Sequence, residues 1–238
     1  MIELTLDGKM MQVEPGTTIL EAAREAGVEI PTLCHHDGLT PEGNCRLCMV
    51  EIEQRGKKRL VASCMFPIQS TLTVETKSER VLEARRFVLQ LLVNRNPKSP
   101  VIQKLAGEYN VTQESRFASE PDLCIRCGRC VRACEADGTH AIQLVQRGFD
   151  RKVAPPYEQS PESCIGCLAC AEVCPTGKIT YKNEKGTRQI WGRTFEVLAC
   201  ERCGAEFATP EQLAWADTEK EAARYCDHCR KAIFVSHF

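Results

Sequence analysis

The stretch Cys124-Ile-Arg-Cys-Gly-Arg-Cys-Val-Arg-Ala-Cys134 recurs 40 residues later, without a gap, as Cys164-Ile-Gly-Cys-Leu-Ala-Cys-Ala-Glu-Val-Cys174. Each copy has the C-x₂-C-x₂-C-x₃-C spacing of bacterial ferredoxins, in which the fourth cysteine binds the cluster of the other copy. Zinc is the alternative metal, since cysteine binds both, but the tandem spacing favours iron–sulphur clusters. The repeat therefore predicts two [4Fe–4S] clusters, one on Cys124, Cys127, Cys130 and Cys174, and one on Cys164, Cys167, Cys170 and Cys134.

A different cysteine group precedes the repeat, with the spacing C-x₁₀-C-x₂-C-x₁₅-C. Plant-type [2Fe–2S] ferredoxins have a shorter first gap, but share the C-x₂-C pair and the distant fourth cysteine. A zinc site is the alternative interpretation. We expect a [2Fe–2S] cluster on Cys34, Cys45, Cys48 and Cys64.

The residues around this group predict a β-grasp domain, in which a small sheet holds one helix and the cysteine loop. Asp7-Gly8 is a hairpin turn signal between two short apolar–polar alternations. Thr17 or Thr18 can cap a helix that Gly27 ends. The expected elements are strands at 2–6, 12–14, 49–53, 59–62 and 71–75 and a helix at 20–26.

The last four cysteines have the spacing C-x₂-C-x₂₂-C-x₂-C. Two C-x₂-C pairs about twenty residues apart are typical of a zinc ribbon, and structural zinc stabilises small modules of this kind. A further iron–sulphur cluster, a third [4Fe–4S], is the competing interpretation. We expect zinc on Cys200, Cys203, Cys226 and Cys229, with a helix between the two pairs at about 211–224.

Composition narrows the function class. The net charge is −1, which is unlike the basic balance of a nucleic-acid-binding protein. Sixteen of 238 residues are cysteine, so the chain could contain either disulfides or metal sites. The start of the chain has no signal-peptide pattern, and no apolar run is long enough to span a membrane. Disulfides need an oxidising compartment, whereas metal thiolates suit a reducing one. We expect a cytoplasmic metalloprotein without a membrane span.

These patterns together predict an α+β chain of four parts. A β-grasp [2Fe–2S] domain would occupy 1–77, and a helical connector would follow at 78–119. Within it, apolar residues recur at helical steps up to Asn94-Arg-Asn-Pro97, and 99–117 has no clear pattern. A 2x[4Fe–4S] ferredoxin domain would occupy 120–190, and a zinc-ribbon-like module 191–238.

The order of these motifs resembles a known family. Leu33-Cys-His-His-Asp37, Gly43-Asn-Cys-Arg-Leu-Cys48, the Cys124–Cys134 run and Cys174-Pro-Thr-Gly177 are similar to the iron–sulphur, diaphorase-type subunit of soluble NAD-coupled and electron-bifurcating hydrogenases. They are also similar to the N-terminal part of the large peripheral subunit of complex I. The resemblance covers roughly residues 1–180.

One motif of that family is degenerate in this chain. The family has H-P-x-x-C-x-x-C-x₅-C between the helix and the repeat, binding a further [4Fe–4S] cluster through one histidine and three cysteines. The four ligand positions fall here on Asn96, Pro100, Gln103 and Tyr109. We expect that this cluster is absent and that its surrounding fold remains.

The resemblance implies an electron relay without catalytic residues of its own. Its partners would be a flavin- and NAD(H)-binding diaphorase subunit and a hydrogenase catalytic subunit, with ferredoxin as a further partner if the complex bifurcates electrons. The same role in an NAD-dependent formate dehydrogenase, or as a stand-alone ferredoxin-type carrier, remains open. A self-sufficient oxidoreductase and a purely scaffolding zinc protein are the other function classes. No phosphate-binding glycine loop follows a strand, so NAD and flavin are expected to bind elsewhere.

Overall fold

The structure is a computed structural model that describes residues 1–114, 122–216 and 224–235. It divides into two units, 1–129 and 130–238, and each is described by itself below. No helix among the described residues is both long enough and apolar enough to cross a bilayer.

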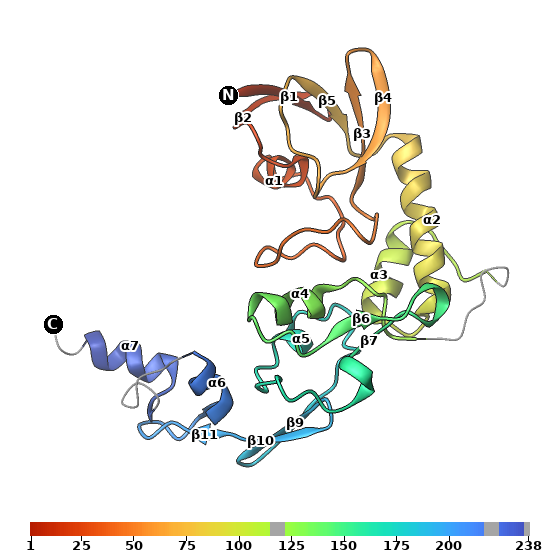
Figure 1. Cartoon of the computed structure of the whole chain (residues 1–238). Helices are drawn as coiled ribbons and strands as arrows, with labels where there is room; N and C mark the ends of the chain where they lie inside the picture. The colour runs from red at the N-terminus through yellow and green to blue at the C-terminus, as the bar shows by residue number, and fades with distance from the viewer. Residues whose placement is uncertain (115–121, 217–223, 236–238) are drawn as a thin grey trace. The chain divides into compact units, whose positions relative to one another are not determined.

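The first unit contains the expected sheet and helix. Its strands are β1 (Ile2–Leu6), β2 (Lys9–Val13), β3 (Met49–Gln54), β4 (Lys57–Ala62) and β5 (Leu72–Glu75). They have the order β2-β1-β5-β3-β4 in the sheet (Figure 1), in which β1 and β5 are parallel and the other neighbours are antiparallel. Asp7 and Gly8 both have positive φ, 47° and 82°, as the tight turn between β1 and β2 requires.

Helix α1 (Ile19–Glu25) begins at a capping box. The Thr18 hydroxyl accepts a hydrogen bond from the Glu21 backbone N–H at 3.2 Å, and the Glu21 carboxylate accepts one from the Thr18 backbone N–H at 2.8 Å. Reciprocal bonds of this kind satisfy two N–H groups that a helix start leaves without partners. The helix buries Ile19, Leu20, Ala22 and Ala23 in the same apolar core as the sheet.

Two helices follow the sheet in the first unit. Helix α2 (Glu79–Arg95) starts at Ser78, as the helical spacing predicts. Helix α3 (Pro100–Glu108) lies in the segment where the sequence shows no clear pattern, and Pro100 occupies its first turn. A separate apolar cluster joins these helices to the cysteine loop, and it contains Leu33, Leu47, Leu89, Val93, Ile102 and Ala106.

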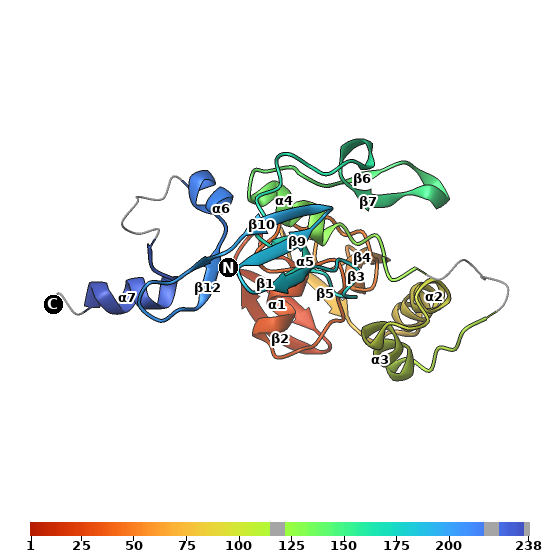
Figure 2. The ribbon, with the colours of Figure 1, turned by 90° about the horizontal axis from the view of Figure 1, so that it is seen from below.

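The second unit is built from short elements around the cysteines. Helix α4 (Arg129–Ala136) enters this unit at Cys130, and α5 (Ala169–Glu172) carries Cys170. Strands β6 (Gln143–Val145) and β7 (Lys152–Ala154) pair as a hairpin. A three-stranded antiparallel sheet follows, with β9 and β10 lying side by side (Figure 2); its strands are β8 (Lys182–Glu184), β9 (Thr187–Ile190) and β10 (Arg193–Glu196). Two 3₁₀ turns, at Gly148–Asp150 and Pro156–Glu158, flank β7.

The last part of the second unit carries the C-terminal cysteines. Strands β11 (Leu198–Ala199) and β12 (Glu206–Ala208) form a small ribbon. Helix α6 (Pro210–Trp215) begins after a second capping box, which Thr209 and Gln212 form. Its first residue, Pro210, lies one position before the helix start expected from the sequence. The remainder of that expected helix falls mostly on residues 217–223, which lie outside the described residues. Helix α7 (Asp227–Val235) follows Cys226.

Candidate metal centres

The four cysteines predicted to hold a [2Fe–2S] cluster lie in the first unit, on the loop before β3 and just after β4. The Sγ atoms of Cys48 and Cys64 are 3.4 Å apart, and the Cys45 backbone N–H donates to the Cys34 sulphur at 3.4 Å. Cys34, Cys48 and Cys64 are buried, and Cys45 is half-buried. The loop thus presents its thiols as two pairs, 34 with 45 and 48 with 64.

Hydrogen bonding within each pair separates the pKa values of its two thiols. The hydrogen bond shared with the Cys34 thiol lowers the pKa of Cys45 to about 5, and the one shared with the Cys64 thiol lowers that of Cys48 to about 6. The same bonds, together with burial, raise the pKa values of Cys34 and Cys64. Thiolates are the form that binds metal. Two pairs of thiols suit a cluster of two irons, each bound by one pair.

In the first unit, the side chains at three of the four ligand positions of the degenerate motif form hydrogen bonds. The Asn96 amide donates to the Leu123 carbonyl at 2.6 Å, and the Gln103 amide donates to the Pro97 carbonyl at 2.8 Å. The hydroxyl of Tyr109 accepts a bond from the buried Arg85 guanidinium at 3.2 Å. Arg85 also donates to the carbonyl oxygen of Met49, the residue after Cys48, at 2.8 Å. Through Arg85, the helical connector is therefore bonded to the end of the cysteine loop.

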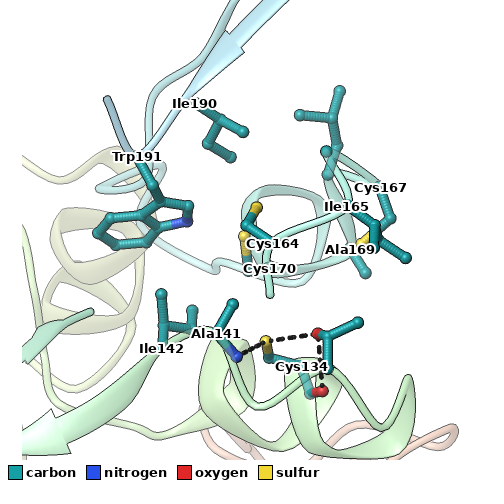
Figure 3. A pocket seen from close by; sticks show the side chains of 13 residues that line it. Cys134, Ala141, Ile142, Cys164, Ile165, Cys167, Ala169, Cys170, Ile190 and Trp191 are labelled. Carbon is teal, nitrogen blue, oxygen red and sulfur yellow. Dashed lines mark hydrogen bonds between the residues drawn. The ribbon is translucent and has the colours of Figure 1, made fainter. Parts of the chain in front are cut away.

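Four cysteines of the ferredoxin repeat line a single cavity in the second unit. The cavity has about 330 Å³ of empty space, including the part open to solvent, and it is lined by Cys134, Cys164, Cys167 and Cys170 together with apolar side chains (Figure 3). These are the four residues that the sequence assigns to one [4Fe–4S] cluster, with Cys134 supplied by the other copy of the motif. Three thiolates from one run and one from elsewhere are the donor set that such a cluster uses.

Two polar groups lie within hydrogen-bonding distance of the Cys134 sulphur. The Ala141 backbone N–H donates to the Cys134 Sγ at 3.1 Å, and the Thr139 hydroxyl lies 3.1 Å from the same atom (Figure 3). The Cys167 thiol donates to the Asp137 carboxylate at 3.1 Å. Burial raises the pKa of Cys164, and raises those of Cys167 and Cys170 to about 12 and 11. Buried thiols of this kind become thiolates readily only when a metal cation compensates the lost hydration.

The backbone carbonyls of the 164–167 turn are held by side chains that come later in the chain. One guanidinium nitrogen of Arg193 donates to the carbonyls of Pro161, Glu162 and Cys164 at 3.0, 2.6 and 2.7 Å. Arg188 donates to the Gly166 carbonyl at 2.7 Å, and the Thr209 hydroxyl donates to the Ile165 carbonyl at 2.6 Å. The β9–β10 hairpin and the start of α6 thus fix the conformation of the cysteine turn.

The other predicted [4Fe–4S] set is divided between the two units. Cys124 and Cys127 belong to the first unit, and Cys130 and Cys174 belong to the second. In the first unit, the Arg126 backbone N–H donates to the Cys124 sulphur at 3.4 Å, and Arg95 donates to the Cys124 carbonyl at 3.2 Å. In the second, N–H groups following Cys174 lower the pKa of that thiol despite the opposing effect of burial. The convergence of these four cysteines stays a prediction.

The C-terminal cysteines converge tightly. The sulphurs of Cys200, Cys203, Cys226 and Cys229 all lie within 4.8 Å of one another, and those of Cys203 and Cys226 are 3.7 Å apart. Within the described ranges, no other group of three or more potential ligands gathers its donor atoms so closely. Burial acts to raise the pKa of Cys200, but the N–H groups of Cys226 and Cys203 outweigh it and lower the value to about 6.

The spacing of these four sulphurs suits a single ion. Four thiolates at the usual Zn–S distance of about 2.3 Å, arranged as a tetrahedron, place their sulphurs about 3.8 Å apart. A [4Fe–4S] cluster holds its thiolates further apart, because each thiolate binds a different iron atom. The donor set and its spacing therefore fit zinc.

The spacing of the cysteines predicts the cluster ligands, but the sequence analysis did not find the residues that support the cysteine turn. Arg188, Trp191, Arg193 and Thr209 lie outside every cysteine motif. The signal available for Thr209 was its position before Pro210 with Gln212 three residues on, which is a capping-box pattern. The glycine of Trp191-Gly192 indicates a turn. No local pattern indicates that this turn packs against the preceding cysteine run.

Comparison with protein families agrees with the order of the predicted clusters. Residues 1–79 match the model of a 2Fe-2S iron-sulfur cluster binding domain. Residues 119–181 match a 4Fe-4S dicluster domain, and a second model of that description matches residues 157–206.

Curated relatives match most of this chain. NADP-reducing hydrogenase subunit HndD of Solidesulfovibrio fructosivorans is 35% identical over 75% of the chain, and the alpha subunit of the NADPH-Fe(3+) oxidoreductase of Geobacter sulfurreducens is 32% identical over 85%. The mitochondrial NADH-ubiquinone oxidoreductase 78 kDa subunit of Candida albicans is 31% identical over 76%. The matches cover 36%, 27% and 28% of these proteins, so the chain spans about a third of their length or less.

The match to a solved structure covers most of this chain and most of the matched chain. In the crystal structure of an NAD⁺-reducing [NiFe]-hydrogenase in the H₂-reduced state, one chain matches with a TM-score of 0.64 and 31% identity. The match covers 74% of this chain and 86% of that one.

Proposed function

Because this chain belongs to the family of iron–sulphur subunits that NAD(P)-linked hydrogenases share with complex I, we propose that it relays single electrons through one [2Fe–2S] and two [4Fe–4S] clusters. The observation that carries the proposal is the cavity lined by Cys134, Cys164, Cys167 and Cys170. Three of these cysteines come from one copy of the motif and the fourth from the other copy. Such an exchange of ligands is typical of two-cluster ferredoxins.

The [2Fe–2S] cluster would be held by the two thiol pairs of the first unit. Cys34 with Cys45 would bind one iron, and Cys48 with Cys64 would bind the other. The 3.4 Å contact within the second pair supports this division. The clusters supply one-electron chemistry when bound, and the chain holds their thiolates, keeps them from water and donates backbone N–H groups to their sulphurs.

The donor and acceptor of these electrons would lie on other chains. We propose a flavin- and NAD(H)-binding subunit on one side and a hydrogenase catalytic subunit on the other, because two of the matched proteins are named as NADP-reducing and NAD⁺-reducing hydrogenases. Thiolate ligands favour a reducing compartment for the complex, and we propose the cytoplasm. Zinc on the C-terminal cysteines would stabilise the end of the second unit rather than carry electrons, since zinc has no redox chemistry.

The test is anaerobic reduction of the purified full chain by dithionite, followed by electron paramagnetic resonance and visible absorption. We expect one [2Fe–2S] signal and two [4Fe–4S] signals, all reoxidised by a one-electron acceptor. NADH alone is expected to leave the clusters oxidised. Visible bands that are missing from the intact protein would contradict the relay. Turnover of NADH by the chain alone would show instead that it is an enzyme in its own right.

A further inference from the structure

Trp191 is held in a backbone conformation that its side chain does not favour. It forms a two-residue turn with Gly192 between β9 and β10, where Ile190 pairs with Arg193. Its φ is 52°, and that of Gly192 is 77°. Turns of this type favour Asn-Gly, and a bulky residue at positive φ is uncommon and costs about 1–3 kcal/mol. Strain of this size persists where the surrounding structure fixes it, which is frequent at functional sites.

The indole of Trp191 carries a buried N–H that is not hydrogen-bonded. Its Nε1 atom is shielded from solvent and has no partner in the part of the chain that the structure describes. An unpaired buried donor costs about 1–3 kcal/mol. The turn therefore combines an unfavourable backbone conformation with an unsatisfied polar atom.

The Trp191 side chain faces the cysteine cavity. Trp191 lines it, and its nitrogen points toward the sulphurs of Cys164 and Cys170 (Figure 3). An indole N–H can only donate, and a thiolate sulphur can only accept.

We propose that the indole N–H of Trp191 donates a hydrogen bond to the Cys170 thiolate of the [4Fe–4S] cluster held by Cys134, Cys164, Cys167 and Cys170, and thereby raises the reduction potential of that cluster. The inference rests on the proposed function, because it needs the cluster in that cavity. One-electron reduction makes the cluster and its thiolates more negative, so a donor to a ligand sulphur stabilises the reduced form more than the oxidised form.

The hairpin that carries Trp191 is fixed to the cluster-binding turn. The guanidinium of Arg193, two residues on, bonds to three carbonyls of the 161–164 segment. The same group lies 4.7 Å from the centre of the Phe195 ring, and that ring packs against Gly166, where a Cβ would come within 2.9 Å of it. The backbone that carries Trp191 is therefore anchored to the segment that carries Cys164.

The direct test needs no substitution at Trp191. The full chain is labelled with ¹⁵N at the tryptophan indoles, purified without oxygen and reduced with dithionite, and its [4Fe–4S] signal is examined by pulsed electron paramagnetic resonance. The chain has two tryptophans, so a labelled Trp215→Phe variant assigns the result, because Trp215 does not line the cavity. We expect a ¹⁵N coupling in the wild-type protein and in Trp215→Phe. A [4Fe–4S] signal without such a coupling overturns the proposal.

A redox titration of Trp191→Phe supplies the second readout. Phenylalanine keeps an aromatic ring in the cavity but removes the donor. We expect one [4Fe–4S] potential to become more negative, while the [2Fe–2S] potential of the same sample stays constant. If Trp191→Phe keeps its iron content and its [4Fe–4S] potentials are unchanged, the result contradicts the proposed hydrogen bond of Trp191 but not the proposed relay. A protein that shows no [4Fe–4S] signal at all contradicts the proposed relay as well.

Discussion

The indole nitrogen of Trp215 donates a 2.8 Å hydrogen bond to the backbone carbonyl oxygen of Asp137, a residue 78 positions earlier in the chain. The Asp137 carboxylate in turn accepts a bond from the thiol of Cys167. Helix α6 is thereby joined to the segment after α4 and, through Thr209, to the turn between Cys164 and Cys167. The C-terminal module therefore supports the surroundings of the cysteine cavity, in addition to its own four cysteines.

Replacing Thr209 by valine should loosen the cysteine turn. The Thr209 hydroxyl donates to the Ile165 carbonyl and caps α6 by accepting from the Gln212 N–H at 3.1 Å. Loss of both bonds is expected to cost about 1–2 kcal/mol, so amide hydrogen exchange of the 164–167 turn should become roughly tenfold faster. Thr209→Ser keeps the hydroxyl and serves as the matched control. Equal exchange rates in valine and serine variants would show that the hydroxyl does not hold the turn.

Cys203→Ser should remove zinc and leave iron in place. Cys203 is the exposed member of the C-terminal set, and a structural zinc site needs all four thiolates. The expected result is a fall in zinc from about one per chain to near zero, measured by elemental analysis. If the variant instead loses about four irons, these cysteines hold an iron–sulphur cluster.

Cys64→Ser should abolish the [2Fe–2S] signal selectively. Its sulphur lies 3.4 Å from that of Cys48, and the two form one of the two thiol pairs. Removing one ligand of a pair leaves one iron with a single protein thiolate. The [2Fe–2S] resonance is expected to disappear while the [4Fe–4S] resonances remain. Retention of the [2Fe–2S] spectrum would show that another residue completes the set.

Arg85→Met should destabilise the [2Fe–2S] domain far more than the neighbouring Arg86→Met. Arg85 is 2% exposed and bonds to Met49 and Tyr109, whereas the Arg86 side chain is 46% exposed and pairs with Glu79. Loss of buried charged hydrogen bonds costs about 2–3 kcal/mol, and loss of an exposed ion pair costs about 0–1 kcal/mol.

The check is the temperature at which the visible circular dichroism of the [2Fe–2S] cluster is lost. Since 1 kcal/mol shifts the midpoint of a domain of this size by about 4–8 °C, Arg85→Met should lower that temperature by at least about 8 °C. Similar midpoints in the two variants would mean that the bonds of Arg85 do not stabilise the cysteine loop.

Much of the first unit was predictable, because its signals are local. The turn at Asp7-Gly8, the cap at Thr18 and the helix start at Ser78 each depend on residues within a few positions, and the structure confirms all three. Helix α3 was not predicted, although Pro100 at its first turn and the buried Ile102 and Ala106, four residues apart, were available as signals.

The supporting residues of the cavity could not be predicted in the same way. Arg188, Arg193 and Thr209 bond to backbone carbonyls 22, 29 and 44 positions away. Every residue carries the same carbonyl group, so the sequence does not indicate which carbonyl accepts the hydrogen bond. The cysteine spacing predicts a cluster, whereas the side chains that fix its surroundings depend on how the chain folds back on itself.

The iron and zinc content of the full chain, purified without oxygen, tests the central claim most directly. One [2Fe–2S] cluster, two [4Fe–4S] clusters and one zinc ion predict about ten irons and about one zinc per chain. About fourteen irons without zinc would contradict the zinc assignment and extend the relay to the C-terminal cysteines. Zinc as the main metal, with little or no iron, would contradict the relay itself.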